Sequence, residues 1–232
     1  MRLTSKKTTQ IIGIFIFLCP YLYGTDCFRC DLMGKIRGII FDLDGTLVHL
    51  PIKWQRIVEQ IEGLLGVKIG SLLDLYVELW GTESYESVSH IVEEFEMAAL
   101  DKLEILDDSP QLLRRLSVKY NLGIVTFQSR TVARKVIEKI GINGLVMATR
   151  NDSPTRIGQI SRVVSASSLS FKDFLVVGDR LNDVYSALKV GCKAVLVDRI
   201  GRDIPIRELR KFIVISNLKN LLSIIEKENE RH

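Results

Sequence analysis

Histidine and cysteine are both scarce in this chain of 232 residues, and each scarcity excludes a class of protein. The three histidines, His49, His90 and His232, lack the spacing that a histidine-based zinc site requires. Four cysteines are too few to hold a chain of this length together as a disulfide scaffold. The net charge of +4 is too small to indicate a nucleic-acid-binding protein.

A hydrophobic run long enough to span a bilayer is also lacking near the N-terminus, where residues 11–23 are apolar but too few. Basic residues before this run make it similar to a signal-peptide core, although the cleavage signal is poor. Met33 is a natural start for a domain that begins with a strand. We therefore interpret residues 1–32 as a leader. Of its two explanations, we favour sequence that lies upstream of the true start codon over a working export signal. The expected location is cytoplasmic, or exported or membrane-tethered if the leader is retained.

The rest of the chain alternates short apolar runs with helical patterns. Its composition, 47% hydrophobic and 26% charged over the whole chain, excludes wholesale disorder. The apolar runs predict strands at residues 36–41, 122–126, 145–148, 174–177, 194–197 and 212–215. This alternation predicts an α/β fold, a Rossmann-like parallel sheet with helices on both faces.

One segment breaks the alternation. Residues 51–106 contain no strand signal, and their apolar side chains recur at helical spacing. The segment holds 11 acidic and four basic side chains, whereas the remainder of the chain is basic. We expect a small all-helical domain, here called the cap, inserted after the first strand. The α/β core then comprises residues 33–50 and 107–232.

A cluster of carboxylates follows the first predicted strand, in the sequence Asp42-Leu43-Asp44-Gly45-Thr46. Residues two apart in an extended chain face the same way, so Asp42 and Asp44 are predicted to point into one site. Gly45 permits a sharp turn after them. Because open α/β sheets bind ligands at the carboxyl ends of their strands, this motif marks a candidate catalytic site.

A second acidic pair follows the strand predicted at residues 174–177. Asp179 and Asp183 are four residues apart, and a helix beginning there would project both from one side of its first turn. Carboxylates from two strand ends repel one another unless a cation joins them. Hard oxygen ligands suit Mg²⁺, and the sequence therefore predicts a magnesium site formed with Asp42 and Asp44.

These motifs resemble those of the haloacid dehalogenase-like superfamily, whose members are mostly phosphatases. The resemblance covers about residues 35–198. It rests on Asp42–Thr46, on the strand that ends at Thr126, and on Gly178-Asp179 with Asp183. The cap lies where the superfamily places a helical C1-type cap, as in phosphoglycolate-phosphatase-like members.

The third motif of the superfamily, a lysine before the fourth motif, has no match in this chain. The region between residues 149 and 156 contains arginine but no lysine. Arg156, in the first turn of a predicted helix, is the first candidate for the missing cation, and Arg150 is the second. Arginine keeps the positive charge but presents a planar fork in place of a point charge.

The resemblance implies a Mg²⁺-dependent phosphatase that hydrolyses a small phosphomonoester, of the phosphoglycolate or sugar phosphate type. Asp42 would be the nucleophile that forms an aspartyl-phosphate, and Asp44 the general acid and base. Thr126 and Arg156 would bind the phosphoryl group, and Asp42, Asp44, Asp179 and Asp183 would hold the metal. A phosphomutase, a 2-haloacid dehalogenase and a non-catalytic binding module remain alternatives. The implied partner is a small phosphorylated metabolite, with no nucleic acid; the oligomeric state stays open.

Overall fold

The computed structural model describes residues 34–230. The expected leader at residues 1–32, which holds Cys19, Cys27 and Cys30, lies outside the described residues. Among the helices of residues 34–230, none is long and apolar enough to cross a membrane.

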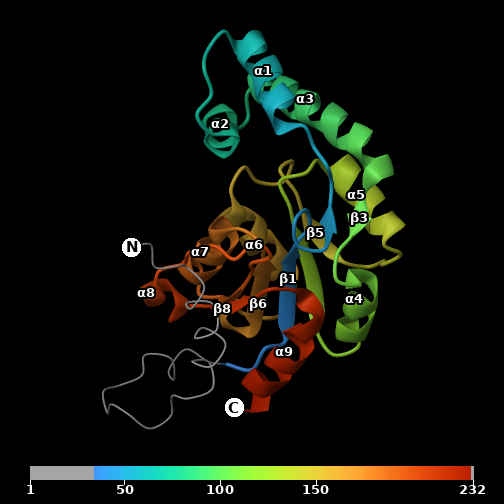
Figure 1. The fold of residues 1–232 in the computed structure, drawn as a ribbon, viewed down its shortest axis with the longest axis vertical. Coiled ribbons are helices and arrows are strands. Elements are labelled where there is room, and N and C mark those ends of the chain that lie inside the picture. Colours follow the sequence, from blue (N-terminus) through green and yellow to red (C-terminus); the bar gives the residue numbers. More distant parts are fainter. Residues whose placement is uncertain (1–33, 231–232) are drawn as a thin grey trace, which may run out of the picture. The chain divides into compact units, whose positions relative to one another are not determined.

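A six-stranded parallel sheet forms the centre of the α/β core (Figure 1). The strand order is β5-β4-β1-β6-β7-β8. These strands span Gly38–Asp42 (β1), Asn121–Val125 (β4), Val146–Ala148 (β5), Phe174–Gly178 (β6), Lys193–Val197 (β7) and Ile213–Ile215 (β8). All six predicted strands are present, so the prediction of a parallel sheet is confirmed.

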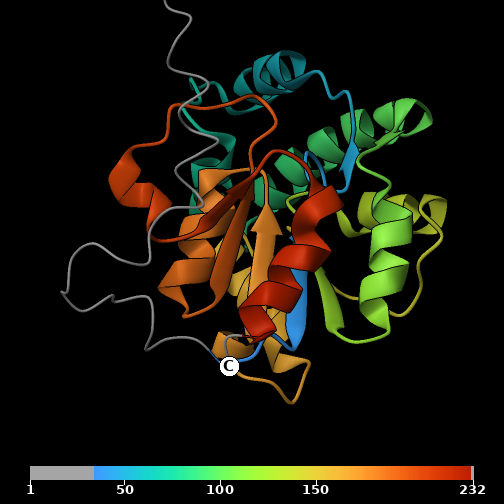
Figure 2. The ribbon, with the colours of Figure 1, turned by 60° about the horizontal axis from the view of Figure 1, so that its bottom comes forward.

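Helices cover both faces of this sheet, as predicted. One apolar cluster joins the strands to α4 (Ser109–Ser117), α5 (Arg130–Lys139) and α9 (Leu221–Glu230), and Figure 2 shows α9 across that face. A second cluster joins the other face to α6 (Arg156–Ser165) and α7 (Leu181–Lys189). The shorter helices are α8 (Ile206–Leu209) and the 3₁₀ turns η1 (Leu100–Lys102), η2 (Phe171–Asp173) and η3 (Leu218–Asn220).

Helix α6 begins slightly later than the sequence suggests. Ser153-Pro154 indicates a helix start, but the first helical residue is Arg156 because Thr155 is the N-cap. The hydroxyl oxygen of Thr155 accepts a hydrogen bond from the backbone N–H of Gly158 at 3.1 Å. Arg156 therefore lies at the very start of α6.

The cap (residues 51–106) contains three helices, α1 (Trp54–Leu65), α2 (Leu72–Leu79) and α3 (Glu83–Ala99), which lie together beyond one end of the sheet (Figure 1). They share an apolar cluster of their own. The expectation of no strand in this segment is wrong at β3 (Glu104–Ile105), which pairs antiparallel with β2 (Val48–His49). Two-residue strands are too short to show an alternating pattern. This small sheet joins the two chain segments that connect the cap to the core.

Candidate active site

Three aspartates converge at the carboxyl ends of two neighbouring strands. Asp42 is the last residue of β1, and Asp179 directly follows β6, which pairs with β1 in parallel. Asp183 lies in the first turn of α7, whereas Asp179 precedes that helix, which begins at Leu181. One carboxylate oxygen from each of Asp42, Asp179 and Asp183 lies within 4.8 Å of the others. The structure thus brings together three of the four predicted metal-binding side chains.

Two glycines make room for these carboxylates. Gly45 has a φ of +89°, and a Cβ atom there would lie 2.5 Å from Oδ2 of Asp179. A Cβ atom at Gly178 would lie 2.4 Å from Oδ2 of Asp183. Any larger residue at either position would displace a carboxylate. The glycines therefore let the side chains pack directly against the main chain.

Arg156 lies among the aspartates at the start of α6. Its Nη2 donates a hydrogen bond to Oδ1 of Asp42 at 2.7 Å, and its Nη1 donates to Oε1 of Gln159 at 2.8 Å. Its Nε lies 2.7 Å from Oδ1 of Asp183, an ion pair whose N–H direction does not meet hydrogen-bond geometry. The guanidinium also lies over the ring of Phe127, 4.6 Å from its centroid. Arg156 is thus held in place by four residues.

Burial, with a smaller contribution from mutual repulsion, disfavours the charged forms of Asp42 and Asp179. Burial raises the pKa of Asp42 well above its usual range, and the negative charges of Asp183 and Asp179 add to this, against the opposing charge of Arg156. Burial also raises the pKa of Asp179, with a further contribution from Asp183. One arginine therefore does not neutralise this group of acids.

Asp44 and Thr126 complete the set of residues predicted from the motifs. Oδ1 of Asp44 accepts a hydrogen bond from the backbone N–H of Leu50 at 2.8 Å, and burial raises the pKa of this carboxyl. Thr126 is buried just past the end of β4, and its hydroxyl oxygen accepts a hydrogen bond from the N–H of Gln128 at 3.1 Å. The hydroxyl hydrogen of Thr126 has no acceptor among the hydrogen bonds of the described residues.

A cavity of about 440 Å³ lies between the strand ends and the cap. The core contributes Asp42, Asp44, Thr126, Phe127, Gln128, Arg156, Arg180, Asn182 and Asp183, and the cap contributes Trp54, Ser71, Leu72, Leu73, Tyr76 and Glu96. The cap residues, with Phe127 and Gln128, were not predicted as site residues. Arg180 and Asn182 lie inside the predicted fourth motif, which is the one signal that could have found them. The cavity has the size of a small-molecule site.

The acidic cluster fits a divalent metal ion. Within residues 34–230, Oδ1 of Asp179 and Oδ1 of Asp183 are buried oxygens without a hydrogen-bond donor. Four aspartates at the site face two guanidinium groups, those of Arg156 and Arg180. A hard cation bound by carboxylates would be a ligand partner for these two oxygens and would balance the remaining negative charge.

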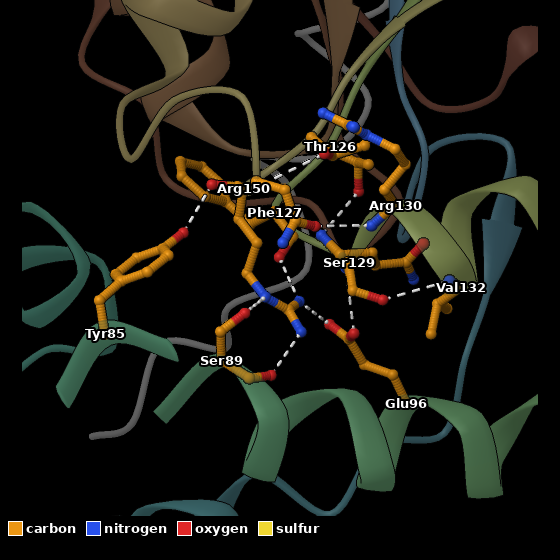
Figure 3. Close-up of polar contacts among 12 residues, drawn as sticks. Tyr85, Ser89, Glu96, Thr126, Phe127, Ser129, Arg130, Val132 and Arg150 are labelled. Carbon is orange, nitrogen blue, oxygen red and sulfur yellow. Dashed lines mark hydrogen bonds and ion pairs between the residues drawn. The ribbon is translucent and has the colours of Figure 1, made fainter. Parts of the chain in front are cut away.

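Arg150, the second candidate for the missing cation, does not line this cavity. It is fully buried in the junction between the cap and the core, where side chains from α3 project toward it (Figure 3). Its guanidinium donates four hydrogen bonds: to Oε1 of Glu96 at 2.6 Å, to the carbonyl oxygen of Phe127 at 2.8 Å, and to Oγ and the carbonyl oxygen of Ser89, both at 2.9 Å. The two arginines proposed for one role therefore occupy different regions.

Comparisons with known proteins agree with this architecture. The family model described as haloacid dehalogenase-like hydrolase matches residues 39–197, more than half of the chain. A haloacid dehalogenase-like hydrolase domain-containing protein of Arabidopsis thaliana is 23% identical over 211 residues, which cover 83% of this chain and 84% of that protein.

Two solved structures have the same fold. A HAD phosphatase from Thermococcus onnurineus matches with a TM-score of 0.60 and 21% identity, covering 82% of this chain and 98% of that one. A predicted phosphoglycolate phosphatase from Haemophilus somnus matches with a TM-score of 0.60 and 21% identity, covering 83% and 99%. The predicted family is thereby confirmed: this chain belongs to the haloacid dehalogenase-like hydrolases.

Proposed function

We propose that this hydrolase is a Mg²⁺-dependent phosphatase that cleaves a small phosphomonoester through an aspartyl-phosphate on Asp42. The observation that carries the proposal is the convergence of Asp42, Asp179 and Asp183 within 4.8 Å. Arg156 binds Asp42 at 2.7 Å, and both residues line the cavity between the strand ends and the cap. Phosphoryl transfer depends mainly on positioning and charge neutralisation, and this arrangement of charges supplies both.

The proposed reaction begins at Asp42. A carboxylate oxygen of Asp42 attacks phosphorus in line with the leaving group, forming the aspartyl-phosphate as the bond to the leaving oxygen breaks. A water molecule then attacks the same phosphorus, the bond to Asp42 breaks, and inorganic phosphate leaves. Arg156, hydrogen-bonded to Asp42 at 2.7 Å, would orient this carboxylate for the attack.

Asp44 is the proposed general acid and base. It would give a proton to the leaving alcohol in the first step and take one from the attacking water in the second. Its raised pKa supports this role, because a larger share of the carboxyl is protonated at neutral pH than for an ordinary aspartate. The hydrogen bond from the N–H of Leu50 would hold the side chain in one orientation.

The phosphoryl group would be held by Thr126 and Arg156. The hydroxyl hydrogen of Thr126 would donate to one phosphoryl oxygen, and Arg156 would offset the charge on another. Asp42, Asp179 and Asp183, with the backbone carbonyl of Asp44, would hold the magnesium ion. When bound, Mg²⁺ supplies positive charge that favours ionised Asp42 and neutralises phosphoryl oxygens.

The lining of the cavity away from the aspartates supports a small leaving group with hydroxyls. Trp54, Leu72 and Leu73 give the wall an apolar surface. Within the described residues, the hydroxyl of Tyr76 and both amide atoms of Gln128 are buried without hydrogen-bond partners, and these side chains line the same cavity. Hydroxyls on a sugar phosphate would satisfy them. Phosphoglycolate is the other substrate proposed, because the similar structure from Haemophilus somnus is described as a predicted phosphoglycolate phosphatase.

A screen of phosphorylated metabolites with purified protein, with and without Mg²⁺, tests the proposal. We expect Mg²⁺-dependent release of inorganic phosphate from sugar phosphates or phosphoglycolate, and slower release from a phosphopeptide or an oligonucleotide. A bisphosphate in the panel distinguishes a mutase from a phosphatase. A mutase would transfer the phosphoryl group back to the substrate and release no inorganic phosphate. No phosphate release from any ester would contradict the proposed function.

A further inference from the structure

Arg150 contacts one cavity-lining residue of the core and one of the cap, although it does not line the cavity itself. Its guanidinium donates to the carbonyl oxygen of Phe127 on the core side. On the cap side it lies 5.9 Å from the ring centroid of Tyr76. Phe127 and Tyr76 both line the cavity, whereas Arg150 does not. Arg150 therefore contacts the residues that shape the cavity without facing its interior.

Glu96 on α3 provides a second attachment for the loop of residues 126–129, which contains Phe127. While its Oε1 binds Arg150 at 2.6 Å, its Oε2 accepts a hydrogen bond from the backbone N–H of Ser129 at 3.1 Å. The backbone N–H of Arg150 also donates to the carbonyl oxygen of Gln128 at 3.4 Å. The loop of residues 126–129, which begins with Thr126, is thus held by polar contacts from both Glu96 and Arg150 (Figure 3).

The loop of residues 126–129 is connected to Asp42 through Arg156. The backbone of Phe127 is held by Arg150, and the ring of Phe127 lies 4.6 Å from the guanidinium carbon of Arg156. Arg156 in turn binds Asp42 at 2.7 Å. A continuous series of contacts therefore runs from α3 of the cap through Glu96, Arg150, Phe127 and Arg156 to Asp42.

Burial makes this junction specific. The side chains of Arg150 and Glu96 are 0% and 1% exposed, so neither ion can exchange its partner for water. A lysine at position 150 would keep the charge but could not form the planar array of four hydrogen bonds. The fork of the guanidinium, and not its charge alone, is what reaches Phe127 and Ser89 together.

We propose that Arg150 and Glu96 are positioning residues, which fix the 126–129 loop to α3 and thereby hold Phe127 and Arg156 in register with Asp42. The proposal rests on the proposed phosphatase function for its kinetic consequences. For binding of a phosphate anion it rests on the contacts alone.

The test compares Arg150→Lys and Glu96→Gln with Arg130→Lys. Arg130 forms an ion pair with Asp152 at 2.6 Å close to the same loop, but its side chain is 47% exposed, so it is a matched control. We measure kcat and KM for p-nitrophenyl phosphate, the dissociation constant of inorganic phosphate from the fluorescence of Trp54 and Trp80, the far-UV circular dichroism spectrum and Tm.

For Arg150→Lys we expect kcat to fall and phosphate binding to weaken, each by about tenfold or more, with an unchanged circular dichroism spectrum. Glu96→Gln should show a smaller loss, because the amide oxygen can still accept one of the two hydrogen bonds. Arg130→Lys should match the unsubstituted protein. A purely structural role would lower Tm of the Arg150 and Glu96 variants while leaving kcat, KM and phosphate binding unchanged, and this result would overturn the proposal.

The two proposals fail in different ways. If the unsubstituted protein binds phosphate but turns over no ester, the phosphatase function fails, while weaker phosphate binding by Arg150→Lys still supports the positioning role. If the unsubstituted protein neither binds phosphate nor releases it from any ester, both proposals are overturned.

Discussion

Two buried arginines, six positions apart in the chain, form opposite kinds of electrostatic site. At the junction of cap and core, Arg150 meets one carboxylate, Glu96, and its other hydrogen bonds go to neutral oxygens. At the strand ends, Arg156 meets the carboxylates of Asp42 and Asp183 together, with Asp179 close by. The first site is balanced in charge, and the second keeps an excess of negative charge.

The difference shows how a satisfied network and an incomplete one can be told apart. Within residues 34–230, Oδ1 of Asp179 and Oδ1 of Asp183 are buried and accept no hydrogen bond, although the latter lies in an ion pair with Arg156. The guanidinium of Arg150, in contrast, has hydrogen-bond acceptors on all three nitrogens. A complete network holds parts of the molecule together. An incomplete one requires a further group, so the strand ends are where we expect a metal ion and an anionic substrate to bind.

The comparison is tested most severely at Asp42. Asp42→Asn removes the proposed nucleophile but keeps the side chain's shape, so we expect phosphatase activity to fall by about 10³-fold or more while the fold persists. Turnover and circular dichroism measure the two effects. The control is Asp101→Asn, at an exposed aspartate of the cap, which should keep full activity. Activity of Asp42→Asn within tenfold of the unsubstituted protein would remove Asp42 as the nucleophile.

Substitution of Arg156 sharpens the contrast between the two arginines. Arg156→Ala removes positive charge next to Asp42, and we expect kcat/KM to fall by about 10²-fold. Arg156→Lys should recover part of this loss, because the charge remains although the fork does not. Arg162→Ala, at an exposed arginine of α6, is the control and should leave kcat/KM unchanged. Equal activity of the alanine and lysine variants would contradict a role for the charge.

The proposed metal site is tested at Asp179. Asp179→Asn removes one negative charge and one proposed ligand oxygen, so we expect the Mg²⁺ concentration for half-maximal activity to rise by about tenfold or more. Titration of activity with Mg²⁺, and of Tm with Mg²⁺, both measure the change. An unchanged titration would exclude Asp179 from the metal site.

The smallest effect is expected at Asp173, a carboxylate outside the candidate site whose hydrogen bonds are complete. Hydrogen bonds from Arg37 and Ser170 lower the pKa of Asp173 to about 2. Because the pKa of Asp173 is lower in the folded chain than in the unfolded chain, this carboxylate stabilises the fold at any pH above its unfolded pKa. The stabilisation is lost as the pH falls from about 4 toward 2. Asp173→Asn should therefore lower Tm by about 2–4 °C at neutral pH. Thermal unfolding between pH 7 and pH 3 should show that the difference in Tm between the two proteins becomes smaller. A difference that stays constant with pH would contradict the lowered pKa of Asp173 as its cause.

The acidic side of the site could be predicted from sequence because local geometry determines it. Asp42 ends a buried strand and Asp44 lies two residues further on, while Gly178-Asp179 lies at the end of another strand that pairs with the first. Parallel pairing then brings both strand ends to one edge. The same reasoning gave the six strands, since each is a short apolar run.

The cationic side and the cap could be predicted only in part. Arg150 and Arg156 are alike in sequence, and only tertiary contacts separate the junction from the site. Glu96 and Ser89 share the buried face of α3 with Val88 and Val92. Polar residues within an apolar stripe indicate a buried polar partner, but the stripe does not identify that partner as Arg150, 54 residues away from Glu96.

Gly45 and Gly178 leave the carboxylates of Asp179 and Asp183 against bare main chain. The mutual repulsion of these carboxylates with Asp42 is therefore a cost that the folded chain carries and the unfolded chain does not. If Mg²⁺ binds at the proposed site and only to the folded chain, it would stabilise the fold by about 2.7 kcal/mol at one hundred times its dissociation constant. The proposed metal site would then link folding, as well as catalysis, to the supply of magnesium.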